Sequence, residues 1–451
     1  MKKQFFYAAM ALAVMSSCSK DNDPGIGNPE ESNDRVPIEL GLNTPTVSAV
    51  SRGTGSVGDV ATGDNTWNNQ KLFIYMINKE DGLEAQEGPD GAKTTILDNA
   101  TLEFRAPKDG ADQTIRIYQT GSYDAGTDKG TIQYKYYPAN GRYTFFGYHI
   151  DDATADAPTI TAAEKKVTGI TIDGTQDLLA ANTTEMTAED ATTVGNPYYD
   201  VANVIGATDW AALMNYSFGA RTARKKVVPI LKFNHQLARL KFFVRAGSDG
   251  AAGQKYNGGT WEANNAADGT TLGMQVTGIN LTKMVDKVDM DLLTTTSTRN
   301  GTTEGTFSVC TKKADGTLDN TGLATTPVVP KYPHGNANIP ADDPDTDGTL
   351  VGEPVMFFPN GDITLSIDLK QYVKDTENET TGEIVYTTLE KLNNPLTIEQ
   401  AKISGAVKTF TPGASYNVYI TIYGFERIEI SAVLTAWTEG GDIETDIEDG
   451  K

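Results

Sequence analysis

Residues able to carry metal or nucleophilic chemistry are few in this chain of 451 residues. The three histidines are His149, His235 and His334, and the two cysteines are Cys18 and Cys310. The histidines lack the HxxxH or HExxH spacing of zinc sites, and no GxSxG or GxxxxGK[ST] motif occurs. We therefore expect no cofactor and no enzymatic activity, with His235 as a hydrogen-bonded structural residue at a strand turn. A glycosidase-like carboxylate pair has no distinguishing spacing among the 60 acidic residues.

One acidic loop has the beginning of a calcium-binding pattern. Asp343, Asp345 and Asp347 form a D-x-D-x-D-G run that ends at Gly348. Alternate carboxylates of this kind can converge on a hard cation, but the twelfth position of the loop is Pro354 instead of glutamate. The pattern favours a solvated acidic turn, and a calcium site is the alternative.

The N-terminus has the features of an export signal. Lys2 and Lys3 precede an apolar stretch, Phe5–Met15, that is too short to span a bilayer. Small residues then lead to Cys18, as at a lipoprotein processing site. We expect residues 1–17 to be a signal peptide and Cys18 to carry a lipid that anchors the chain in the outer membrane, and the alternative is an ordinary signal peptide. Only Cys310 then remains, which predicts a buried, inert thiol and no internal disulfide.

The segment that follows combines a strand pattern with a protease site. Val36, Ile38, Leu40 and Leu42 alternate with other residues and predict a strand, and Arg52 lies in a loop of Ser, Gly and Thr that suits a trypsin-like protease. Cleavage after Arg52 releases residues 18–52, a lipidated propeptide and tether that contains this first strand. A sandwich that loses a strand has an open edge that can accept a strand from another molecule.

The C-terminus offers a candidate for that incoming strand. Ile443, Thr445 and Ile447 alternate with acidic residues in a short tail. The pattern fits a donor strand, and it also fits a disordered acidic terminus.

Composition and patterning predict an all-β protein with long loops. The net charge of −22 argues against nucleic acid and anionic lipid as partners. Runs of four to nine β-branched and aromatic residues recur between Gly, Asp, Asn and Thr clusters, and helix signals are few, with one short helix expected at Asp209. We expect an N-terminal β-sandwich at residues 53–190, a linker or insertion at 191–226, and a C-terminal β-sandwich at 227–451 that ends in the candidate donor tail.

The order of several motifs resembles the fimbrillin family, the pilins of type V pili. The matching motifs are the signal ending at Cys18, Val36–Leu42 followed by Ser51-Arg52-Gly53, and the segments at 72–75, 143–148, 177–181, 229–242, 410–420 and 435–437. The resemblance implies two tandem transthyretin-like β-sandwich domains, export as a lipoprotein, cleavage after an arginine by a trypsin-like protease, and polymerisation by strand exchange. Arg52 is then the expected cleavage residue, and Arg35 is an alternative that leaves Val36–Leu42 in place.

These features predict a structural subunit of cell-surface fimbriae whose partners are other pilin subunits and whose role supports adhesion. Longer loops than usual leave shaft, tip and anchor positions open. A surface lipoprotein that binds glycan is the alternative, with Trp67, Trp261, Tyr198 and Tyr199 as candidate sugar-stacking residues.

Overall fold

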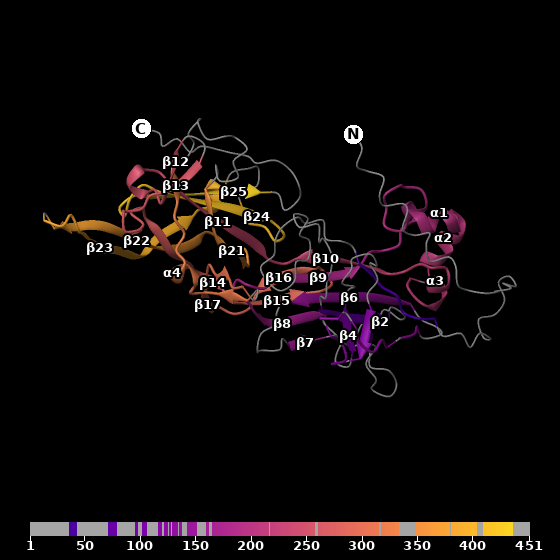
Figure 1. The fold of residues 1–451 in the computed structure, drawn as a ribbon. Helices are drawn as coiled ribbons and strands as arrows, with labels where there is room; N and C mark the ends of the chain where they lie inside the picture. Colours follow the sequence, from indigo (N-terminus) through magenta and orange to yellow (C-terminus); the bar gives the residue numbers. More distant parts are fainter. Residues whose placement is uncertain are drawn as a thin grey trace.

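The computed structural model describes most of the chain between residues 36 and 435. Described residues are 36–42, 71–78, 95–97, 102–105, 116–137 without 120, 125, 128 and 134, 142–150, 159–161, and 165–435 without 216, 258–259, 315–316, 333–347, 379 and 404–408. These residues form an all-β structure of several sheets with a few short helices, as the sequence predicts (Figure 1).

The first sheet gathers strands from the N-terminal half, together with β10 just beyond the midpoint of the chain, around the two eight-residue strands β2 and β6. Its order is β1-β10-β9-β6-β2-β4-β5, and β3 also pairs with β2. The strands are β1 (Gly41–Leu42), β2 (Lys71–Asn78), β3 (Thr95–Leu97), β4 (Leu102–Arg105), β5 (Arg116–Gln119), β6 (Tyr143–Ile150), β9 (Leu178–Thr183) and β10 (Ile230–His235). β1 runs parallel to β10 and the other pairs are antiparallel.

Both faces of this sheet are buried. Along β6, Tyr143 and Phe145 belong to one core cluster, whereas Phe146, Tyr148 and Ile150 belong to the other. All eight residues of β6 are buried. Burial on both sides explains why the strand is a continuous apolar run instead of an alternating one.

One face of the first sheet shares a core with a small sheet built from both halves of the chain. The order of that sheet is β16-β15-β8-β7. β7 (Thr159–Thr161) and β8 (Lys166–Thr171) precede residues 191–226, the helical segment, whereas β15 (Lys287–Asp291) and β16 (Thr296–Arg299) follow it by more than 60 residues. Val288 and Met290 of β15 pack in the same cluster as Val167 and Ile170 of β8. The C-terminal half therefore contributes a hairpin to the packing of the first sheet.

The second sandwich pairs two larger sheets. One has the order β13-β12-β20-β11-β24-β25 with β21 beside β11, and the other has the order β17-β14-β22-β23. Their strands are β11 (Ala238–Ala246), β12 (Gln254–Asn257), β13 (Thr260–Ala263), β14 (Gln275–Val285), β17 (Glu304–Ser308), β20 (Lys331–Tyr332), β21 (Thr349–Phe357), β22 (Ile363–Glu377), β23 (Ile384–Ile398), β24 (Ser415–Ile422) and β25 (Ile428–Thr435). A small hairpin, β18 (Thr311–Lys312) and β19 (Leu318–Asp319), precedes α4 (Gly322–Thr325).

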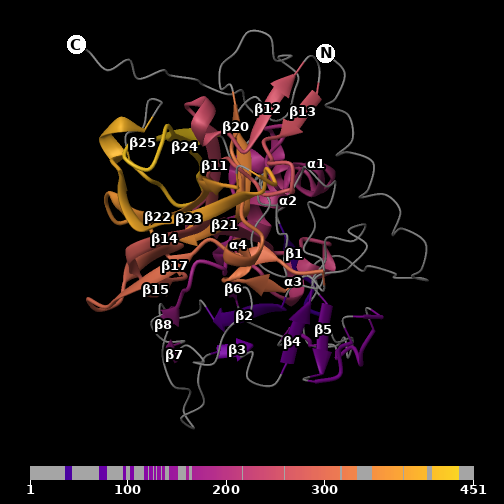
Figure 2. The ribbon, with the colours of Figure 1, turned by 60° about the vertical axis from the view of Figure 1, so that its left-hand side comes forward.

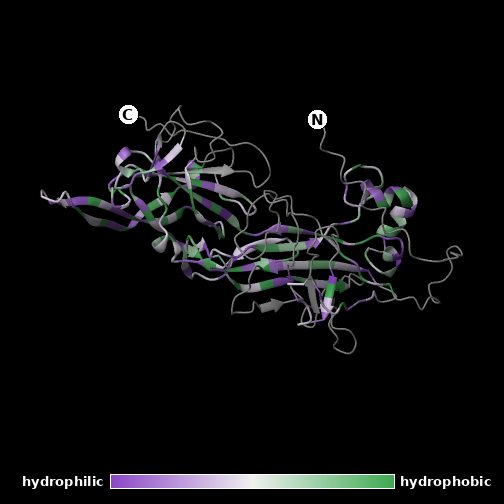
Figure 3. Cartoon of the chain, viewed as in Figure 1, coloured by the Kyte–Doolittle hydropathy of each residue, from purple (hydrophilic) through white to green (hydrophobic). Residues whose placement is uncertain are grey.

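The inner faces of the second sandwich follow the predicted alternation. Leu240, Phe242 and Val244 are completely buried on β11, and Val418 and Ile420 are completely buried on the parallel neighbour β24. Figure 3 shows the resulting alternation of hydrophobic and hydrophilic residues along these strands. Cys310 is buried near this core, as the sequence predicts, and its thiol donates to the Ser308 carbonyl.

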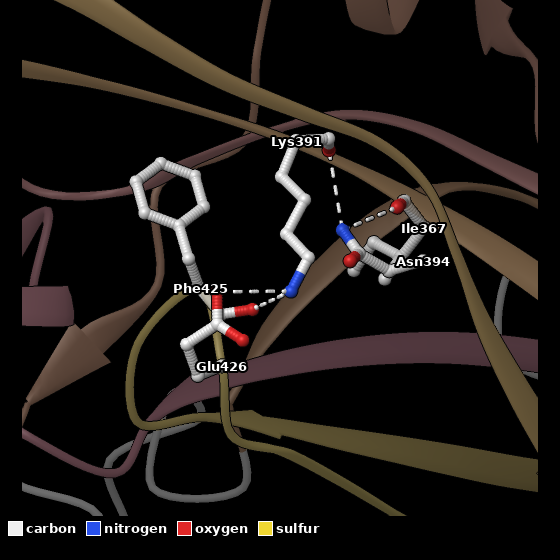
Figure 4. Close-up of polar contacts among 5 residues, drawn as sticks. All are labelled: Ile367, Lys391, Asn394, Phe425 and Glu426. Carbon is white, nitrogen blue, oxygen red and sulfur yellow. Dashed lines mark hydrogen bonds and ion pairs between the residues drawn. The ribbon is translucent and has the colours of Figure 1, made fainter.

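A long hairpin extends the second sandwich. β22 and β23 have 15 residues each, and the pair reaches out at one end of the molecule, far from β2 and β4 (Figures 1 and 2). Lys391 of β23 donates to the Phe425 carbonyl at 2.6 Å and contacts the Glu426 carboxylate at 3.3 Å, and the Asn394 amide donates to the Ile367 carbonyl (Figure 4). The Lys391 contacts attach the hairpin to the β24–β25 connection, and the Asn394 bond joins the two strands of the hairpin.

Residues 191–226, expected as a linker or insertion, contain three short helices. They are α1 (Tyr199–Ile205), α2 (Ala207–Met214) and α3 (Ala220–Arg224). The expectation of a helix at Asp209 is right, but Asp209 lies in the first turn of α2 and Gly206 is the N-cap. Trp210 is fully buried, and its indole N–H donates to the Thr187 carbonyl at 2.6 Å. This contact fixes the helical segment against the chain that follows β9.

Candidate functional site

The candidate site is the groove occupied by residues 36–42, which lie between two other segments of backbone. The Ile38 N–H donates to the Lys135 carbonyl at 2.8 Å, and the Tyr137 N–H donates to the Val36 carbonyl at 2.9 Å. At the other end, the Gly41 N–H donates to the Pro229 carbonyl at 2.9 Å, next to the parallel pairing of β1 with β10. We call residues 36–42 the N-terminal segment. It joins β10 to residues 135–137.

Only part of the N-terminal segment is a regular strand. The sequence predicts a strand over Val36–Leu42, whereas β1 covers Gly41–Leu42 and Pro37 forms a single bridge with Tyr136. Proline has no N–H to donate. The bridge tolerates Pro37 because its two hydrogen bonds use the Val36 carbonyl and the Ile38 N–H instead.

The side chains of the N-terminal segment alternate between core and solvent. Ile38 is 7% exposed and Leu40 is 2% exposed, and both belong to the second core cluster. Glu39 between them is exposed, and Val36 packs against the same cluster while partly buried. The segment therefore binds as a strand does, with one face in the core.

The floor of the groove comes from both the first sheet and the helical segment. Leu72, Ile74 and Met76 of β2 share the cluster of Ile38 and Leu40, together with Leu231 of β10. Trp210, Leu213 and Phe218 of the helical segment complete this core. The N-terminal segment and the helices thus cover the same face of the sheet.

Two tyrosines place hydroxyl groups in this apolar groove. The Tyr198 hydroxyl accepts a hydrogen bond from the Ile230 N–H at 3.0 Å and donates to the Thr184 carbonyl at 3.2 Å. It thereby holds the start of β10, which is the strand that pairs with β1. Burial raises the pKa of Tyr198, and burial together with nearby Tyr198 and Glu39 raises the pKa of Tyr137. Both groups are therefore neutral hydroxyls at neutral pH.

Sequence reasoning did not identify Tyr137 as a groove residue. Residues 131–137 form one of the runs of β-branched and aromatic residues that predict a strand, whereas the structure gives them isolated bridges at Ile132 and Tyr136. Tyr198 was considered as a sugar-stacking residue, but it is only 2% exposed. The sequence does contain one signal for a covered groove, which is the continuous apolar run Tyr143–Ile150. Such a run indicates a strand buried on both faces, so a second layer of the protein must cover its other face.

The motifs of the family resemblance meet one another in the structure. His235 Nδ1 lies 2.7 Å from the Asp177 carboxylate, which confirms His235 as a structural residue. Asp177 also accepts from the Leu178 N–H, and the Gln236 N–H donates to the Leu178 carbonyl. Segments at 177–181 and 229–242 are therefore joined as neighbouring strands β9 and β10.

A second pair of motifs meets in the C-terminal sandwich. The Arg239 guanidinium, which is 2% exposed, donates through Nε to the Ser415 hydroxyl at 3.0 Å. The Tyr416 hydroxyl accepts from the Thr411 N–H and donates to the Thr409 carbonyl. The Arg239 bond ties β11 to β24, and the Tyr416 bonds fix the turn that precedes β24.

Several predicted site residues lie outside the described residues. These are Cys18, Arg35, Arg52, the acidic loop at Asp343, Asp345 and Asp347, and the tail with Ile443, Thr445 and Ile447. Within the part of the chain that the structure describes, no three His, Cys, Asp or Glu side chains are grouped to hold a metal ion. No helix in that same part is long and apolar enough to cross a bilayer.

Comparison with known proteins gives structural neighbours only. No protein-family profile and no curated protein matches the chain in sequence. A "putative cell adhesion protein" from Bacteroides uniformis has a TM-score of 0.40 at 13% identity, over 91% of this chain and 100% of its own. The fimbrial anchor protein Mfa2 from Porphyromonas gingivalis has a TM-score of 0.29 at 9% identity, over 89% of this chain and 98% of its own.

A third neighbour has a different description. A protein of Bacteroides thetaiotaomicron described as a "putative polysaccharide binding" protein has a TM-score of 0.31 at 8% identity, over 90% of this chain and 98% of its own. Because all three TM-scores are below 0.5, we base the functional proposal on the contacts of the chain itself.

Proposed function

We propose that this chain is a structural subunit of cell-surface fimbriae that supports adhesion and polymerises by exchange of strands between subunits. The observation that carries the proposal is the N-terminal segment, which places Ile38 and Leu40 in a groove between β10 and residues 135–137. Removal of that segment opens an apolar groove with free backbone groups along β10. Such an edge binds a strand from another molecule.

The energy of the exchange comes from alternate apolar side chains. Full burial of one Leu or Ile side chain contributes about 1.5–3 kcal/mol, so Ile38 and Leu40 together contribute roughly 3–6 kcal/mol. A donor strand with two apolar residues recovers a similar amount. The intact chain nevertheless keeps its own segment, because a covalently attached strand has a far higher effective concentration than a neighbour's strand.

Proteolysis then controls assembly. Cleavage after Arg52 turns the N-terminal segment into a separate peptide that dilutes away once it dissociates. The same cut separates the chain from the lipid on Cys18, so export as an outer-membrane lipoprotein precedes release into the fibre. The tail with Ile443, Thr445 and Ile447 is the proposed donor strand, since its alternation copies that of the N-terminal segment.

The glycan-binding alternative has less support from the contacts. Trp261 on β13 is half-buried, with the Tyr256 ring at 5.3 Å and the Lys331 ammonium 4.9 Å from its ring centroid. Tyr198 is buried and unavailable to a sugar. A surface glycan-binding lipoprotein keeps its N-terminal segment and its lipid, which separates it experimentally from a pilin.

The test compares arginine variants in cells that carry the trypsin-like protease. Arg52→Ala is expected to remain full-length after the signal, monomeric and lipid-anchored, while wild type forms a ladder of polymers on a denaturing gel run without heating. Arg35→Ala is the matched control and should polymerise like wild type. Polymers formed by Arg52→Ala would contradict the proposed processing, and a monomeric Arg35→Ala would move the cleavage site to Arg35.

A further inference from the structure

The β22–β23 hairpin carries part of its apolar face beyond the second sandwich. Alternate residues of β22 from Ile363 to Leu369 are buried, and the same face continues outward to Val373, which is only partly buried. On β23, Val385 and Leu389 lie on this face, where they are 51% and 42% exposed. We call Val373, Val385 and Leu389 the overhang. Exposed apolar side chains that are grouped in this way are typical of a surface that binds another molecule.

The tip of the hairpin, beyond the overhang, is acidic. Asp375, Glu377 and Glu383 are exposed there, and the Lys374 ammonium is paired with the Glu377 carboxylate. The hairpin therefore presents carboxylates next to apolar side chains. Its complement is a surface that presents cations next to apolar side chains.

The helical segment carries a group of cations at the opposite end of the molecule (Figure 1). Arg221, Arg224, Lys225 and Lys226 are all exposed, and no acidic residue occurs between positions 210 and 248. We call these four residues the basic cluster. Among the described residues, no carboxylate forms an ion pair with Arg224, Lys225 or Lys226.

The helical segment also exposes apolar side chains. Val204 on α1 is 85% exposed, and Val194 before α1 is 78% exposed. The backbone that follows α3 is hydrogen-bonded, because the Lys226 N–H donates to the Ala223 carbonyl at 2.9 Å. Cations and apolar side chains are thus present together on one ordered segment.

A second copy of the chain is the partner that fits both surfaces. The hairpin and the helical segment lie at opposite ends of the molecule and cannot meet within one chain (Figure 1). Between copies they meet head to tail, and such a contact between two different surfaces can repeat as an open filament. With a net charge of −22, two copies repel each other over most of their surfaces, so the basic cluster is a favoured point of approach for an acidic tip.

We propose that the β22–β23 hairpin of one copy docks on the helical segment of the next, with the acidic tip at the basic cluster and the overhang over Val194 and Val204. This inference rests on the proposed function and adds to it the surfaces by which subunits meet before a strand is exchanged. Ala220 of α3 shares the core cluster of Ile38 and Leu40, so the docked hairpin lies beside the groove. The charges speed the association of copies, and the overhang slows their separation.

The experiment measures by light scattering how fast copies cleaved after Arg52 associate at low ionic strength. Glu377→Lys with Glu383→Lys reverses the tip, and Lys225→Glu with Lys226→Glu reverses the cluster. Each double variant alone should associate about tenfold more slowly than wild type, because like charges then face each other. An equal mixture of the two should associate about as fast as wild type, since every contact between unlike copies again joins opposite charges.

Two controls separate the contact from general effects. Glu304→Lys with Glu399→Lys makes the same change of net charge as the tip reversal, at exposed positions outside both surfaces, and should associate as fast as wild type. Leu389→Ser in the overhang should raise the dissociation constant of the joint about fivefold in analytical ultracentrifugation. Thr388→Ser, on the opposite face of β23, should leave that constant unchanged.

The outcomes distinguish this contact from strand exchange itself. A mixture that associates no faster than either variant alone, or reversed variants that associate as fast as wild type, would overturn docking of the hairpin while strand exchange stands. An unchanged dissociation constant of Leu389→Ser would likewise contradict the contact. Absence of any joint in the cleaved wild type would refute the proposed function, and this inference with it.

Discussion

Leu40 is more deeply buried than Ile38, the other core side chain that the structure describes in the N-terminal segment. It is 2% exposed in the core that it shares with Leu72 of β2 and Leu231 of β10, whereas its neighbour Glu39 is exposed. Besides the pairing of β1 with β10 at Gly41 and Leu42, the described backbone bonds of the segment are at residues 36, 38 and 41. The buried side chains of Ile38 and Leu40 add to these bonds in holding the segment in place.

Substitution of Leu40 by alanine should loosen the segment. Loss of a buried leucine side chain typically costs about 2–5 kcal/mol. The amide protons of Ile38 and Gly41 should then exchange with solvent much faster in the intact precursor, as measured by hydrogen–deuterium exchange. Glu39→Ala is the control and should leave both rates close to those of wild type. Equal protection in Leu40→Ala and wild type would show that the core does not hold the segment.

At the scale of elements, the helical segment and the N-terminal segment cover the same face of the first sheet. Trp210 is fully buried in that core and is tied by its indole N–H to Thr187. α1, α2 and α3 are too short to be stable alone. Their order comes from this packing, so the groove depends on them.

Trp210→Ala should destabilise the first sheet and the groove together. Loss of a buried tryptophan costs about 3–5 kcal/mol, and a lower melting temperature with earlier protease release of residues 36–42 is expected. Val204→Ala on α1 is the control, since Val204 is 85% exposed and should leave the melting temperature unchanged. A melting temperature of Trp210→Ala equal to that of wild type would mean that the helices do not support the groove.

Alternating strands could be predicted from the sequence, whereas strands without alternation could not. The alternating runs Arg239–Arg245, Tyr416–Tyr423 and Ile428–Ala436 predict strands, and β11, β24 and β25 match them within two residues. β9, with the sequence Leu-Leu-Ala-Ala-Asn-Thr, was missed as a strand because it is buried on both faces and rich in alanine. β23 was missed because Pro395 and many polar residues obscure its pattern.

The groove could be predicted only in outline. Alternation at Ile38 and Leu40 correctly indicated an inward face. Their partners are 90 to 190 residues away at Tyr137 and β10, and pairing at that separation depends on tertiary packing. Of the helices at 191–226, only α2 at Asp209 was indicated by the sequence. α1 and α3 were not, since their stability comes from the core that they cover.

At the scale of the whole molecule, the two halves of the chain are interlocked. β8 from the first half pairs with β15 from the second, and the first core cluster continues from Tyr148 of the first sheet to Phe242 of β11. The Met356 N–H donates to the Gly174 carbonyl at 2.9 Å, which adds a backbone contact between the halves. One core cluster therefore contains residues of both halves of the chain.

The most direct test of the account is the N-terminal sequence of subunits isolated from assembled polymers, together with their intact mass. We predict that polymerised subunits begin at Gly53 and lack Val36–Leu42, while unassembled precursor begins at an acylated Cys18. Polymers whose subunits still begin at Cys18, or at Val36, would contain the N-terminal segment and would contradict assembly by strand exchange in this groove.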